Sequence, residues 1–413
     1  MTLWNPDWAV EVNGLGDVTN LVLSDLTITS GRTDIYSQPI AGYCRFTIKN
    51  LDQSAIAFDV NDAIVVKIKD STDTYVPLFG GDISDIDLVV ATGEPAITQN
   101  ITITALGALS KLPKAITEGV LSKDFDGDQI FEILSQILFS QWNAVPPAET
   151  WNAYDALTTW EEAENAGLGE IDRPGDYELA ARSASTTDIY SLVSNLATSG
   201  LGYIYEDASG RIGYADSTHR SEYLLANGYA YVDGGWAYAN GIATSKRLGD
   251  VRNKVTITYK NGQQETAEDT ESIQTYGTQA QNITTSIEDG ADALSQAEFY
   301  LDIRALPQYQ FKSITFPMAN PNIPDVSRDQ AFNIFMGLPL DIEDLPANIA
   351  GGRYQGFVEG WTWTTRFNAL DLTIIVSPVA YSLQAFRWTS VPVTETFNTV
   401  SPTLDWNNAT IVA

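Results

Sequence analysis

The sequence is poor in the residue types on which many catalytic and metal centres depend. Its 413 residues include one cysteine, Cys44, and one histidine, His219. A single cysteine excludes an intrachain disulfide and a multi-cysteine metal site. A single histidine excludes the paired imidazoles of a His-Glu-x-x-His zinc site. A serine or cysteine nucleophile would have to use His219 as its base, and no Gly-x-Ser-x-Gly elbow accompanies it.

Neither of these residues is expected to take part in chemistry. His219 follows a predicted hairpin, and we expect an exposed or helix-capping side chain there. Cys44 occupies an apolar position of an alternating strand, which predicts core packing.

Positive charge is also scarce. The chain has 23 Lys and Arg against 53 Asp and Glu, a net charge of −30. Such a surface repels nucleic acid, and the basic residues are too scattered to form a binding patch. The acidity has three possible explanations: solubility or adaptation to salt, contact with a basic partner, or a lumen past which a polyanion slides. Composition alone favours the first.

Long apolar runs are missing as well. No stretch of 18 apolar residues exists, so we expect no membrane span. The first residues lack a basic region followed by an apolar run, so we expect no secretory signal. The apolar content of 44% still supplies material for cores, and 413 residues predict two to four compact units.

The acidic motifs give little support to a metal or glycosidase site. The segment 124–128 resembles the start of a calcium loop, but Gln129 stands at the sixth position and Ser135 at the twelfth. A helix that begins near Asp126, as N-cap, explains it better. Paired acids such as 161–162 are uninformative among 53 carboxylates. We expect no catalytic residue, metal or cofactor.

The chain does contain strands with period-two patterning, concentrated before residue 110. Cys44, Phe46 and Ile48 alternate with polar residues, and stretches at 26–29, 64–69 and 101–105 do the same. Helical spacing then predicts helices over 128–142 and 189–197, the second stopped by Gly200. A hairpin pairs 203–206 with 211–214, and the Trp-rich segment 151–170 is predicted to be a loop or partial helix.

Strands return at residue 254. The strand 254–260 is followed by Asn261-Gly262, a pair that favours hairpin turns. A helix near 291–303 and strands at 309–316, 354–366 and 370–376 follow. The predicted class is mainly β with α+β insertions. We predict a first β domain at 1–110 and inserted α/β domains at 111–245. A second β domain follows at 246–380, and a tail or docking segment at 381–413.

Several short motifs occur in the order known from one protein family. They are Ser30-Gly31-Arg32, Pro39, Gly42 and Asn50 near the start; 179–182, 202–211, 252–257 with Asn253, and 272–277 in the middle; and Gly360-Trp361 with 372–378 near the end. Together they resemble minor tail proteins of long-tailed bacteriophages, which are similar to baseplate hub proteins.

The resemblance implies a fold and a function. It implies two tube-like antiparallel β-barrel domains flanking smaller α/β domains, in a homotrimer whose pseudo-sixfold ring matches a hexameric tail tube. The chain would then be a structural protein of the virion, at the distal end of the tail. Its partners would be a distal tail protein, a tape-measure protein and fibre or tip proteins. DNA would pass the lumen without specific binding, which an acidic bore would suit.

Ser30, Gly31, Arg32, Pro39, Gly42, Asn50, Asn253, Gly360 and Trp361 would be structural residues, and the loop from 31 to 42 would be a subunit contact. Three alternatives stay open. They are a tail-associated cell-wall hydrolase, a glycan-binding adhesin suggested by 10 Trp and 19 Tyr, and a hexameric distal tail protein with one barrel.

Overall fold

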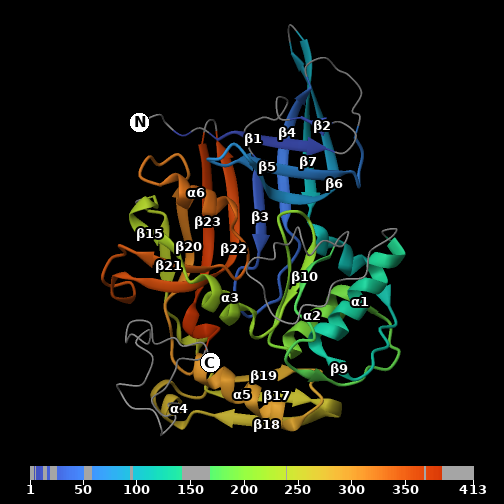
Figure 1. The fold of residues 1–413 in the computed structure, drawn as a ribbon, viewed down its shortest axis with the longest axis vertical. Coiled ribbons are helices and arrows are strands. Elements are labelled where there is room, and N and C mark those ends of the chain that lie inside the picture. Colours follow the sequence, from blue (N-terminus) through green and yellow to red (C-terminus); the bar gives the residue numbers. More distant parts are fainter. Residues whose placement is uncertain are drawn as a thin grey trace.

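The computed structural model describes residues 4, 6–12, 16–18, 26–50, 58–93, 96–141, 168–238, 240–366 and 369–383. Most of the predicted Trp-rich segment, 151–167, and most of the tail, 384–413, lie outside these ranges. Figure 1 shows a large β structure with smaller α/β parts attached beside and below it. Among the described residues, no helix is both long and apolar enough to span a membrane.

The N-terminal strands form one end of the large sheet. Their alternation places one face in the core, where Cys44, Phe46 and Ile48 are at most 2% exposed. The prediction for Cys44 is confirmed. The strands are β1 (Trp8–Val12), β2 (Gly16–Asp17), β3 (Thr27–Gly31), β4 (Tyr43–Asn50), β5 (Ala63–Lys69), β6 (Tyr75–Gly93) and β7 (Ala96–Leu106).

The C-terminal strands form the other end of the same sheet. They are β15 (Ala230–Asp233), β16 (Ile242–Ser245), β20 (Gln310–Pro317), β21 (Pro339–Glu343), β22 (Tyr354–Arg366) and β23 (Ala369–Pro378), with α6 (Asp325–Phe332) beside them. The main path runs β16-β20-β23-β22-β3-β4-β7-β6-β5-β1-β2, and β21 and β15 branch from β22. The antiparallel pairing of β3 with β22, in the middle of this path, therefore joins the N-terminal and C-terminal halves of the sheet.

The smaller α/β parts share a second core. The first part contains α1 (Asp126–Gln141), α2 (Ile189–Ser199), α3 (His219–Asn227), β8 (Ile116–Thr117), β9 (Asp124–Phe125), β10 (Leu168–Ile171), β11 (Glu178–Leu179), β12 (Thr187–Asp188), β13 (Tyr203–Glu206) and β14 (Ile212–Ala215). The second contains β17 (Lys254–Tyr259), β18 (Gln263–Glu268), β19 (Ala280–Thr284), α4 (Thr270–Tyr276) and α5 (Gly290–Arg304). It lies at the bottom of Figure 1.

The predicted class, mainly β with smaller α/β parts, is confirmed. The strand pairing divides the chain differently from the predicted boundary at 245/246: β15 and β16 join the large sheet, whereas 254–304 folds as its own α/β layer. The N-cap prediction for Asp126 is wrong. Its buried carboxylate lies in the first turn of α1 and accepts hydrogen bonds from the Tyr177 amide and the Tyr214 hydroxyl.

Candidate functional site

A buried ion cluster lies where the two halves of the large sheet, joined at β3 and β22, meet the α/β parts. Glu359, on β22, accepts a bond from Nε of Arg32 (2.7 Å), which follows β3. It also accepts bonds from Arg220 of α3, at 2.9 and 3.0 Å. The three side chains are at most 7% exposed. We call Arg32, Arg220 and Glu359 the junction cluster.

The junction cluster depends on electrostatic compensation. Burial alone would raise the pKa of Glu359, but Arg220 and Arg32 hold that pKa at about 2. Both guanidinium groups also lie over the ring of Tyr203, at 5.4 and 4.8 Å from its centroid. The cluster thus ties β3, β22 and α3 to Tyr203 of β13.

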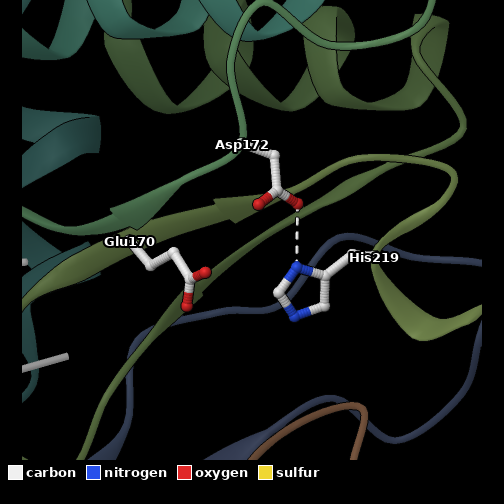
Figure 2. Close-up of side chains that lie close together, drawn as sticks. All are labelled: Glu170, Asp172 and His219. Atoms are coloured by element: carbon white, nitrogen blue, oxygen red, sulfur yellow. Dashed lines mark hydrogen bonds and ion pairs between the residues drawn. The ribbon is translucent and has the colours of Figure 1, made fainter. Parts of the chain in front are cut away.

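The residue before Arg220 forms a second buried cluster. Figure 2 shows His219 at the start of α3 facing two carboxylates, Glu170 of β10 and Asp172 just after it. Nδ1 of His219 lies 2.8 Å from Oδ2 of Asp172. Burial alone would lower the pKa of His219, but Asp172 raises it to about 10. His219 is 4% exposed and follows Thr218, the N-cap of α3, so the prediction of an exposed or helix-capping side chain is wrong.

The local chain explains this placement. Glu170 lies in β10 and Asp172 directly follows that strand, so the same short segment supplies both carboxylates. Asp216 accepts bonds from the amides of Thr218 and His219, which fixes the first turn of α3. The ligand atoms of Glu170, Asp172 and His219 lie within 4.8 Å of one another, so the three could share a proton or one divalent cation. The prediction that the chain binds no metal stays a prediction.

Gly31 and Gly360, two of the predicted motif residues, permit the close approach of β3 and β22. Gly31 pairs with Gly360, and Ser30 pairs with the buried Trp361. A Cβ on Gly360 would lie 2.5 Å from the carbonyl oxygen of Arg32 and 2.9 Å from that of Ser30. Gly31 has a φ of 82°, which other residues rarely adopt.

Replacing Gly360 by alanine is expected to lower the free energy of unfolding by about 1–3 kcal/mol, because the atoms in its way belong to the neighbouring backbone. Gly249 is the matched control, because a Cβ added there would meet no atom within 4 Å. Gly249→Ala should change stability by no more than about 0.5 kcal/mol. Urea unfolding measures both variants, and equal effects would contradict the close-approach argument.

The remaining motif residues make contacts within the chain. Asn253 is fully buried and bonds to Gly277 and Gln279, closing the start of β17. The Gly42 amide donates to Glu206, and the carbonyl of Pro39 accepts from Tyr190. Asn50 ends β4. The loop 31–42 therefore packs on its own α/β part, and its predicted role as a subunit contact stays a prediction.

The overall architecture matches known tail proteins. The 43 kDa tail protein of prophage MuSo2 from Shewanella oneidensis aligns with a TM-score of 0.54 and 11% identity, over 91% of this chain and 99% of that one. A tail protein from Neisseria meningitidis MC58 gives 0.56 and 12%, over 92% and 98%. The chain has a phage tail protein fold. Prophage tail protein gp18 from Listeria monocytogenes EGD-e gives 0.52 and 9%, over 91% and 97%. No protein-family model and no curated protein matches the sequence.

The sequence did not reveal the buried ion pairs of the two clusters. Glu359, Arg220 and Asp172 were not singled out, although Arg32, Gly360 and His219 beside them were. The available signal was a lone carboxylate in the otherwise uncharged run 354–365. In the structure Glu359 is 1% exposed. A carboxylate buried to this extent needs a cation beside it.

Proposed function

We propose that the chain is a structural component of the phage tail tip, a baseplate hub subunit without catalytic activity. The observation that supports this most is the fold itself, shared over at least 91% of the chain with three tail proteins. The fold presents two β regions, joined through β3 and β22, with the α/β parts beside and below them in Figure 1.

The arrangement suits a trimeric ring. Three copies would supply six β regions, which could match a hexameric tail tube in pseudo-sixfold symmetry. The junction cluster and the glycine contact would hold the two β regions of each subunit in a fixed relation. In this proposal the ring sits at the distal end of the tail. It contacts the distal tail protein, the tape-measure protein and fibre or tip proteins.

The ring would also have to let DNA through. The net charge of −30 suits that passage if acidic side chains face the bore, because they would repel the phosphate backbone and prevent adhesion. Mapping the charges onto a trimer tests this part of the proposal, and a neutral or basic bore would contradict it.

Purified chain is expected to assemble into a particle of three times 45.1 kDa. Light scattering coupled to size exclusion measures the mass, and averaged electron micrographs should show a threefold ring. A hexameric ring would favour a distal tail protein instead. A peptidoglycan gel overlay gives the check on catalysis: clear lysis would contradict a purely structural role.

A further inference from the structure

We propose that a pocket beside the junction cluster binds a small oxyanion, of the phosphate or carboxylate class, through Arg304 and Arg220. The pocket has a volume of about 120 Å³ and lies between the loop 31–42, α3, the end of α5 and the turn at 379–382. That volume holds several water molecules, and so has room for a small ion. The inference concerns a single chain and stands whether or not the chain forms a ring.

Arg304 supplies the main observation. It is the last residue of α5, is 3% exposed and lines the pocket. Its Nε and Nη1 atoms are buried and make no hydrogen bond. Its remaining nitrogen, Nη2, donates only a long bond to the carbonyl oxygen of Tyr381, at 3.4 Å. Two nitrogens of a buried guanidinium, with three N–H groups, are therefore left unsatisfied, which is costly unless a ligand accepts their bonds.

Aromatic rings cover the faces of Arg304 but leave its edge available. The guanidinium carbon lies 4.8 Å from the ring centroid of Tyr36 and 4.2 Å from that of Tyr381. Such contacts stabilise the cation through its planar faces. The N–H donors point outward in the plane of the group, where they match the two oxygens of a carboxylate or phosphate.

Arg220 adds a donor at the same pocket. Its Nη atoms bond to Glu359, and Nη1 also bonds to Ser382, but its buried Nε has no partner. Arg32, Arg220 and Arg304 all line the pocket, and Glu359 is the carboxylate that pairs with the first two. The ion pairs among the described residues include none with Arg304.

The other acids nearby do not remove this excess of positive charge. Asp250, which accepts a bond from the hydroxyl of Tyr36 at 3.3 Å, is paired with Arg247. Asp216 also lines the pocket and accepts the amide bonds that begin α3, but together with Glu359 it supplies two carboxylates against three arginines. A positive pocket in a chain of net charge −30 favours a small anion, since a large polyanion would meet the acidic surface first.

The test is a titration of the full-length chain in phosphate-free buffer, with sodium phosphate in one arm, sodium acetate in the second and sodium chloride at matched ionic strength as reference. Calorimetry should show saturable binding of one phosphate or one acetate per chain, and the tighter of the two identifies the ligand class. Thermal unfolding should shift upward with that anion beyond the chloride reference. No saturable heat with either anion in the wild-type chain would overturn the proposal.

Arg304→Met identifies the residue responsible. It keeps much of the aliphatic bulk and should weaken anion binding roughly tenfold or more, through loss of charged hydrogen bonds. Arg353→Gln, which changes a half-exposed arginine that does not line the pocket, should bind like wild type. Equal binding by Arg304→Met and wild type would refute the assignment. If Arg304→Met fails to fold, the wild-type titration still decides.

Discussion

Replacing Glu359 by glutamine is expected to lower the free energy of unfolding by about 3–5 kcal/mol. Glu359 balances both Arg32 and Arg220, and all three side chains are buried. Glutamine keeps the size of the side chain but removes its charge, so two guanidinium groups would stay buried together without a counter-ion. Urea unfolding of wild type and variant at neutral pH measures the difference.

The control for this experiment is the same substitution at the surface of the same sheet. Glu343 of β21 lies 3.5 Å from Arg353, and both side chains are more than 40% exposed. Exposed pairs contribute little, so Glu343→Gln should cost less than about 1 kcal/mol. A loss at Glu359 no larger than the loss at Glu343 would show that the junction cluster does not hold the sheet to the α/β parts.

Elements whose form depends on residues close in the sequence were predictable from the sequence alone. The strand around Cys44 is β4, and its alternating side chains are buried as predicted. The turn at Asn261-Gly262 connects β17 to β18, with φ values of 58° and 85°. The predicted helix stop at Gly200 is the C-cap of α2. In each case the pattern spans only a few residues, which a single sequence reveals.

The pairing of distant strands was not predictable in this way. β3 pairs with β22 across more than 300 residues, and β16 pairs with β20 beyond a complete α/β layer. Short strands such as β15 and β16 carry no signal of their partner, because several edges could accept the same alternating side chains. This is why residues 230–245 were assigned to the inserted part.

The candidate site was half predictable for a related reason. Gly31 and Gly360 were singled out separately, and the structure brings them into register. Glu359 and His219 were missed as buried groups because their partners are remote: Arg32 lies 327 residues from Glu359, and Asp172 lies 47 from His219. Burial of a charge is decided by such partners rather than by the residue itself.

The stability of the chain is expected to fall as the pH rises from 5 to 8. Burial raises the pKa of Asp126 from 3.8 to about 7, despite hydrogen bonds from the Tyr214 hydroxyl and the Tyr177 amide. The folded state therefore holds a proton that the unfolded state releases near pH 4, so stability is lost progressively as the pH rises from about 4 to about 7 and changes little above that. Asp126 alone contributes a loss of roughly 2–3 kcal/mol between pH 5 and pH 8.

Other buried groups change stability in the same direction. Burial also raises the pKa values of Glu206 and Asp216 to about 7, and the raised pKa of His219 extends the loss toward pH 10. Glu359, with a lowered pKa of about 2, acts in the opposite sense but only below its ordinary 4.5. Wild type should therefore lose more stability between pH 5 and 8 than Asp126 alone accounts for.

Asp126→Asn isolates the contribution of that group. Asparagine resembles the protonated acid, so the variant should lose roughly 2–3 kcal/mol less than wild type between pH 5 and pH 8. Asp128, two residues further along α1 and paired with Arg173 at 2.6 Å, provides the matched control. Urea midpoints at several pH values measure all three proteins. Asp128→Asn should keep the wild-type slope, and an unchanged slope in Asp126→Asn would show that Asp126 is ionised in the folded chain throughout this range.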